Sequence, residues 1–274
     1  MPCDCFSVFI LGFFFTTITF AQQDLSVVPK RIVFENGTKR SHTIYLTNKG
    51  ADTATYTLSY VHYKLDSLGG FKQIPRDSFP TPSEPYLRVF PKRVTLAPGE
   101  TQIARLQLRN YSNLPQGEFR SHLLFRGLPK VFRRNPLQKK EDEGVGVKLV
   151  PVYGITIPNI VRKGNNTTEL RFGDAKVYLN AEGKQTLDFT LFREGNMSVY
   201  GDIEVFFKPK SGAAKMLATI PGMGVYAENN KRILSMVVEG TLPNKTGEIV
   251  LRFISKEKAT AKKVLASYTV PVAL

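Results

Sequence analysis

The sequence predicts an all-β protein made of two immunoglobulin-like β-sandwich domains. Short runs rich in β-branched and aromatic residues recur along the chain, with Gly, Pro, Asn and Asp between them. Helical periodicity of 3.6 residues is nearly absent. The 274 residues, of which 42% are hydrophobic, are enough for two domains with a core each.

The N-terminus carries a short apolar segment, 6–20. Thr19 and Ala21 fit a cleavage site, so we expect residues 1–21 to be a signal peptide and the mature protein to be periplasmic. The segment is short for a membrane span. Both cysteines of the chain lie in this leader, so the mature protein is expected to have no disulfide and no thiolate metal site.

Residues 22–163 are expected to form the first domain. Turn signals such as Asn36-Gly37 and Pro98-Gly99 separate its strands. A Pro- and Gly-rich stretch, 64–85, is expected to be a loop. The predicted strands are 25–34, 42–47, 54–63, 87–95, 101–108 and 119–125. This spacing is typical of an immunoglobulin-like sandwich.

The last strand of this domain is expected within one long apolar segment, 145–161, which follows a highly charged stretch, 130–144. The segment is longer than an ordinary strand of about 5–6 residues. Pro151 and Pro158 exclude a regular helix. A long apolar edge strand predicts pairing with another chain. The alternative is that the segment closes the sheet of its own domain.

A polar segment, 162–166, is expected to link the two domains, and residues 164–274 to form the second sandwich. Its runs also alternate with turn residues. The predicted strands are 170–172, 176–180, 186–193, 201–207, 216–220, 232–239, 248–255 and 264–272.

The sequence shows no arrangement of residues that is typical of a catalytic site or a metal site. The three histidines have no ligand spacing, and no phosphate-binding or nucleophile motif occurs. We therefore expect a non-enzymatic protein without a cofactor or metal. The formal charge of +15 is compatible with an anionic partner or with solubility alone. No helical basic stripe is present, which argues against a nucleic-acid partner.

Four segments, in this order, resemble the periplasmic pilus chaperones of the PapD type. Two of them are strand motifs with a characteristic arginine or turn, PKRIVF and VTLAPGETQIARL. The third is LPQGEFRSHLLFRGLP, and the fourth is the long apolar segment. The matching residues are 29–34, 94–106, 114–129 and 145–161. They cover most of residues 25–163, whereas the second domain matches only as a generic β-sandwich.

The resemblance implies a boomerang of two sandwiches with a cleft between them. It implies that the partners are pilus or fimbrial subunits that lack their last strand, and an outer-membrane usher that receives them. The long strand, about 145–157, would be lent to the subunit, and the same strand would allow a self-capping dimer. The implied donor-strand residues are Val145, Val147, Leu149 and Pro151.

The resemblance also implies a site for the C-terminal carboxylate of the subunit. Arg31 matches the arginine of that site, and a guanidinium suits a carboxylate because it donates two parallel hydrogen bonds. Thr156 stands where the family has a lysine, so another base is expected to substitute. The candidate substitutes are Arg120, His122, Arg126 and Arg162. Alternatively, each of these lies on a solvated sheet face.

A second class of function is a secreted structural or adhesive β-sandwich protein of the cell surface. A pilin would carry an N-terminal extension of alternating apolar residues for its neighbour. Only residues 22–26 precede the first predicted strand motif after the leader, which is too short for that role. A carbohydrate-binding module would use exposed aromatic residues, and the chain has no Trp.

Overall fold

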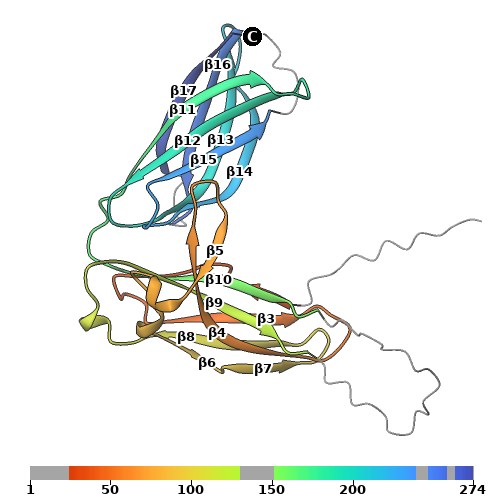
Figure 1. The fold of residues 1–274 in the computed structure, drawn as a ribbon, viewed down its shortest axis with the longest axis vertical. Coiled ribbons are helices and arrows are strands. Elements are labelled where there is room, and N and C mark those ends of the chain that lie inside the picture. The colour runs from red at the N-terminus through yellow and green to blue at the C-terminus, as the bar shows by residue number, and fades with distance from the viewer. Residues whose placement is uncertain (1–24, 130–150, 239–245, 258–262, 274) are drawn as a thin grey trace, which may run out of the picture.

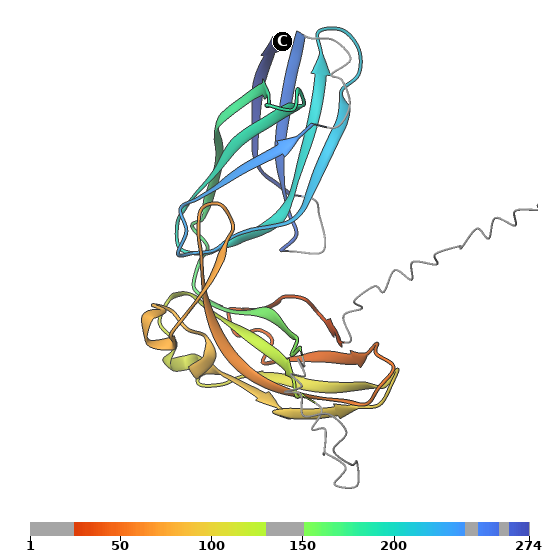
Figure 2. The ribbon, with the colours of Figure 1, turned by 45° about the vertical axis from the view of Figure 1, so that its right-hand side comes forward.

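The computed structural model describes residues 25–129, 151–238, 246–257 and 263–273. They form two β-sandwiches that meet at an angle and give a bent molecule (Figure 1). The second view confirms that the second sandwich stands on one end of the first (Figure 2). Within the described ranges, no helix is long and apolar enough to cross a membrane. The predicted leader lies outside these ranges.

The first sandwich packs a four-stranded sheet against a six-stranded one. The order of the first sheet is β1 (Leu25–Val28), β3 (Ser41–Asn48), β8 (Thr101–Leu108) and β6 (Leu87–Phe90). The order of the second is β2 (Ile32–Glu35), β10 (Gly154–Lys163), β9 (Gly117–Gly127), β4 (Ala54–Leu65) and β5 (Phe71–Ile74), with β7 (Arg93–Leu96) also paired to β4.

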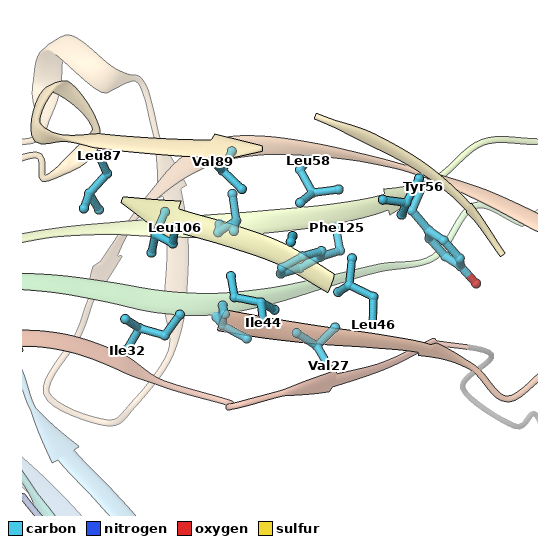
Figure 3. Close-up of a cluster of buried hydrophobic side chains, with 14 of the residues drawn as sticks. Val27, Ile32, Ile44, Leu46, Tyr56, Leu58, Leu87, Val89, Leu106 and Phe125 are labelled. Carbon is cyan, nitrogen blue, oxygen red and sulfur yellow. The ribbon is translucent and has the colours of Figure 1, made fainter. Parts of the chain in front are cut away.

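Alternation along these strands builds the core between the two sheets. Ile44 and Leu46 of β3 point inward, while Tyr45 between them is exposed. They meet Phe125 of β9 and Leu106 of β8 in the middle of the sandwich (Figure 3). Each such side chain contributes roughly 1.5–3 kcal/mol by burial. This period-two pattern fixes which face of β9 and β10 turns away from the core.

Two runs predicted as single strands are each divided between the two sheets. The run 25–34 becomes β1, paired with β3, and β2, paired with β10. The run 87–95 becomes β6, paired with β8, and β7, paired with β4. Both divisions fall at a proline with a cis peptide bond, Pro29 and Pro91. Proline has no N–H for the ladder, so each prediction of an unbroken strand was wrong at that point.

The stretch 64–85, predicted as a loop, contains ordered structure. β4 continues to Leu65 and turns back as β5, and this hairpin rises towards the second sandwich (Figures 1 and 2). Two 3-10 turns, Arg76–Ser78 and Glu84–Tyr86, follow it. A third, Tyr111–Asn113, lies between β8 and β9.

The second sandwich has a three-stranded and a four-stranded sheet. The first contains β11 (Glu169–Leu179), β12 (Gln185–Glu194) and β15 (Lys231–Val237) in that order. The second contains β14 (Lys215–Val225), β13 (Val199–Pro209), β16 (Thr246–Ser255) and β17 (Lys263–Ala273). The runs 170–172 and 176–180, predicted as two strands, are one strand with a bulge between Gly173 and Lys176.

Candidate functional site

The candidate site begins at a strand edge on β10. β9 pairs with the whole of β10, from Gly154 to Lys163, on one side. On the other side β2 pairs in parallel only with residues 159–162. Among the described residues, no strand pairs with residues 154–158 on that side. This half of β10, which we call the open edge, presents backbone donors and acceptors with which another strand can pair.

The division of the first strand run leaves this edge open. β1 belongs to the other sheet, and the chain reaches β10 only after Pro29. Ile32 is the first residue of β2 to pair with β10, and its partner is Asn159. Arg31 comes directly before Ile32, so it lies where the pairing of β2 ends and the open edge begins.

The side chain of Arg31 reaches the second domain. Its Nη2 atom lies 3.4 Å from Ser198 Oγ and 3.7 Å from Glu257 Oε1. Its guanidinium carbon lies 4.8 Å from the centroid of the Tyr200 ring. Only 12% of the side chain is exposed, and burial lowers the pKa of Arg31 below its ordinary value. Arg31 is thus a buried cation whose charge is only loosely compensated within the described structure.

Arg162 is the opposite case, because its guanidinium is saturated. Its Nε donates to Glu118 Oε2 at 2.8 Å, its Nη1 to Glu35 Oε1 at 2.8 Å, and its Nη2 to Glu257 Oε1 at 2.8 Å. Nη2 also donates to the backbone oxygen of Ser198 at 2.7 Å. Burial alone would lower the pKa of Arg162, but these carboxylates raise it well above its ordinary value. Arg162 therefore ties the two domains together.

Arg120 of β9 lies on the face of its sheet that turns away from the core. Its Nη2 atom donates to Tyr63 O at 2.9 Å and makes an ion pair with Glu228 of the second domain. The guanidinium carbon lies 3.8 Å from the centroid of the Tyr226 ring. The Nε atom is buried and has no hydrogen-bond partner among the described residues. Glu228 is thus the single carboxylate that the described structure places on this buried cation.

His122 lies two residues further along β9, opposite Pro158 of β10. Its ring makes edge contacts with Tyr63 at 5.1 Å and Phe71 at 6.0 Å between centroids. Burial, followed by the charge of Arg120, lowers the pKa of His122 to about 3. The imidazole is therefore neutral at neutral pH, so it does not supply positive charge to the site.

The hairpin between β4 and β5 makes a second contact between the domains. The backbone N–H of Ile233 in β15 donates to Ser67 O at 2.8 Å. Gly69, with φ of +99°, lies against the guanidinium of Arg232, so a β-carbon at this position would overlap with it. The hairpin thus covers part of the edge of β15.

The remaining predicted residues lie apart from these contacts. Arg126 shares the sheet face of Arg120 and His122, as predicted, but it is exposed and lies opposite Gly154. Thr156 is half-buried in the open edge, opposite Leu124. Pro151 is exposed and precedes the strand, so the expected strand over about 145–157 begins only at Gly154 within the described residues. The other donor-strand predictions, Val145, Val147 and Leu149, fall outside the described ranges.

The sequence reasoning missed the acidic residues of this site. Glu118 lies two residues before Arg120 in the sequence, whereas Glu228 and Glu257 come from the second domain. No local pattern signals them, because their partners are distant in the chain. No group of three or more potential metal ligands occurs within the described residues. What the site offers chemically is charge pairing and backbone hydrogen bonding.

No family model matches the sequence, and no curated protein sequence matches it. Solved structures of chaperones, among them the class 5 fimbriae chaperone CfaA, are similar to it over about nine-tenths of its length. The E. coli chaperone DraB has 11% identity and a TM-score of 0.45, covering 90% of this chain and 96% of its own. The Pseudomonas aeruginosa chaperone CupB2 has 12% identity and a TM-score of 0.43, covering 91% and 100%. A Salmonella enterica complex of the SafA pilin with the SafB chaperone has 13% identity and a TM-score of 0.41, covering 90% and 96%. Similarity of this degree says nothing about which residues act.

Proposed function

We propose that this chain is a non-enzymatic periplasmic chaperone for pilus or fimbrial subunits. It binds an incomplete β-sandwich by pairing the open edge of β10 with a strand of the subunit. The observation that carries the proposal is the position of Arg31, a loosely compensated buried cation at the end of that edge. An open edge and a carboxylate-binding group together suit the C-terminal strand of another protein.

The parallel pairing of β2 with β10 predicts the direction of the bound strand. β2 enters the sheet at Ile32, next to Asn159, and runs the same way as β10. A partner strand that occupies residues 154–158 and ends at Arg31 would run parallel to β10 and stop where β2 starts. Its backbone would complete the ladder, and its last carboxylate would meet the guanidinium.

The energetics favour a partner with alternating apolar side chains. Ile155 and Ile157 of the open edge face the core of the first sandwich. A subunit strand beside them would extend that core, and each buried apolar side chain would contribute roughly 1.5–3 kcal/mol. We propose that Val145, Val147, Leu149 and Pro151 prolong this contact as donor residues, and that Thr156 adds a hydroxyl donor. Delivery to an outer-membrane usher belongs to the same proposal.

The test is recovery of the subunit with the chaperone. The tagged mature protein is purified from the periplasm of its own cells, and co-purifying proteins are identified by mass spectrometry. We expect a stoichiometric β-rich protein with native Arg31, and its loss with Arg31→Ala. Arg40→Ala, an exposed arginine of the same domain, is the matched control. Equal recovery with Arg31→Ala and native protein would remove Arg31 from the proposed site.

A further inference from the structure

Two arginines of the first domain converge on one aromatic ring of the second. The guanidinium carbons of Arg120 and Arg31 lie 3.8 Å and 6.0 Å from the centroid of Tyr226. Both side chains are nearly buried, with 3% and 12% exposed. A buried cation is costly unless a negative charge compensates it, so each of these arginines requires a carboxylate nearby.

Of the four bases predicted as substitutes, all of which lie in the described part of the chain, one can join Arg31 in binding a carboxylate. Arg162 is held by Glu118, Glu35 and Glu257. The imidazole of His122 is neutral, and Arg126 lies at the opposite end of the open edge. Arg120 remains, and its charge is paired with a single carboxylate, that of Glu228.

We propose that Arg120 is a second carboxylate-binding group and that Glu228 occupies it while the site is empty. The α-carboxylate of the bound strand, anchored at Arg31, would then displace the side chain of Glu228 from Arg120. This inference rests on the proposed function, since it requires that a carboxylate reaches Arg31.

The surroundings of Glu228 allow its side chain to move away from Arg120 while its backbone stays in place. Arg193 holds the backbone on both sides of Glu228, because its Nη2 donates to Ala227 O at 2.7 Å and its Nε to Asn229 O at 2.8 Å. The side chain of Glu228 is 17% exposed, so rotation about its own bonds can bring the carboxylate to solvent. The displacement thus requires a rotamer change in one residue, while the turn stays in place.

The exchange conserves the charge balance around Arg120. The cation has one carboxylate partner before the exchange and one after it, so no buried charge is left unpaired. Glu228 gains hydration when it leaves, and burial raises its pKa in the place it occupies now. Its present position therefore disfavours its ionised form apart from the pairing with Arg120.

While Glu228 occupies Arg120, the site cannot bind a second carboxylate there. The apparent affinity for the ligand is therefore reduced in proportion to the fraction of molecules in which the site is free. Removing the carboxylate of Glu228 should therefore strengthen binding of a strand with a free C-terminus. The probe is a short synthetic peptide in which Val and Ser alternate, prepared with a free carboxylate and with a C-terminal amide. Its dissociation constant is measured with the full mature protein by fluorescence anisotropy.

We expect Glu228→Gln to tighten binding of the carboxylate peptide by about tenfold or more and to leave the amide peptide unchanged. Glu248→Gln, which removes the same charge from a surface pair with Lys208, should change neither. Glu228→Asp keeps the charge on a shorter side chain and should give an intermediate affinity. If Glu228→Gln unfolds the protein, the affinity of the Glu228→Asp variant for the carboxylate peptide is used as the test instead.

The outcomes separate this inference from the function beneath it. If Arg31→Ala abolishes carboxylate binding but neither Glu228 variant changes it, the displacement is refuted and the proposed function stands. If the native protein binds both peptides equally, carboxylate anchoring fails, and the inference fails with it. Loss of the carboxylate preference in Arg120→Met, together with tighter binding in Glu228→Gln, would support both parts.

Discussion

The Nε atom of Arg162 and the Oε2 atom of Glu118 lie 2.8 Å apart, and each side chain has only 2% of its surface exposed. The same carboxylate oxygen accepts from the backbone N–H and the hydroxyl of Ser198 in the second domain. Arg162 also reaches Glu257 there. These two residues of the first domain thus form the polar centre of the contact between the domains, beside the proposed binding site.

Replacing Arg162 with Met should destabilise the protein strongly. The change leaves Glu118 buried without its cation, and the loss of one partner of a buried pair costs about 3–5 kcal/mol. We expect a loss of this size in the free energy of unfolding, measured with urea. The double variant Arg162→Met, Glu118→Met should recover part of the loss, because the buried carboxylate of Glu118 is removed together with its cation. A double variant with the full additive loss would contradict this account of the pair.

Replacing Arg31 with Met should leave stability nearly unchanged. The variant loses one hydrogen bond at 3.4 Å and one ion pair at 3.7 Å, and it also removes a cation whose burial is unfavourable. We expect the free energy of unfolding to change by less than about 1 kcal/mol. Subunit or peptide binding should be lost nonetheless. A stability loss as large as that of Arg162→Met would show that Arg31 stabilises the fold, contrary to this prediction.

Acid should destabilise the protein through His122. Its pKa in the folded protein, about 3, lies below the ordinary value of 6.5, so the unfolded chain binds a proton first as the pH falls. The stabilisation is present above pH 6.5 and is lost progressively between pH 6.5 and pH 3. Between pH 7 and pH 5 the loss from this residue is about 2 kcal/mol.

The control for this pH dependence is His122→Phe, which keeps an aromatic ring beside Tyr63 and Phe71. Its free energy of unfolding should vary less with pH between 7 and 5 than that of the native protein. Burial also lowers the pKa of His62 and His42, so the unfolding free energy of the variant should still fall with pH, but less steeply. Identical slopes for variant and native protein would show that His122 does not titrate as described.

The hairpin contact with β15 can be tested at Gly69. Gly69→Ala adds a β-carbon against the guanidinium of Arg232 and places a non-glycine residue at φ of +99°. Gly99→Ala is the matched control, since its φ is +73° and no atom lies within 4 Å of the added carbon. We expect a loss of about 1 kcal/mol for Gly99→Ala and a larger one for Gly69→Ala, by urea unfolding. Equal losses would mean that the Arg232 contact contributes nothing.

Thr156 should contribute little to carboxylate binding. A hydroxyl supplies one neutral hydrogen bond, which is worth about 1 kcal/mol. We therefore expect Thr156→Val to weaken the alternating Val and Ser carboxylate peptide by about fivefold at most. A loss as large as that caused by Arg31→Ala would make Thr156 a principal anchor.

The number of sandwiches and most strands could be predicted, because period-two alternation and turn residues are local signals. The division of the first strand run at Pro29 could not be predicted, although the sequence shows the proline. Apolar residues continue on both sides of it, and the change of sheet is decided by packing. The β5 strand was missed because its residues, 71–74, lie in a stretch that is rich in Gly and Pro.

The polar site was only partly accessible from the sequence. Arg31 was singled out by resemblance to a family, and its place at the end of the open edge required the register of β2. The partners of Arg120 and Arg162 could not be predicted, since Glu228 and Glu257 join them only when the second domain folds against the first. Which arginine is saturated and which is loosely paired is a property of that contact.

The most direct test of strand pairing is hydrogen–deuterium exchange of the backbone amides of residues 154–157, with and without bound subunit. Amides that face the open edge have no strand partner in the described structure, so they should exchange rapidly in the free protein. Pairing with a subunit strand should slow their exchange strongly, while amides of β3 and β8 stay unchanged. If the subunit binds and these amides keep their rapid exchange, the open edge of β10 is not where it binds.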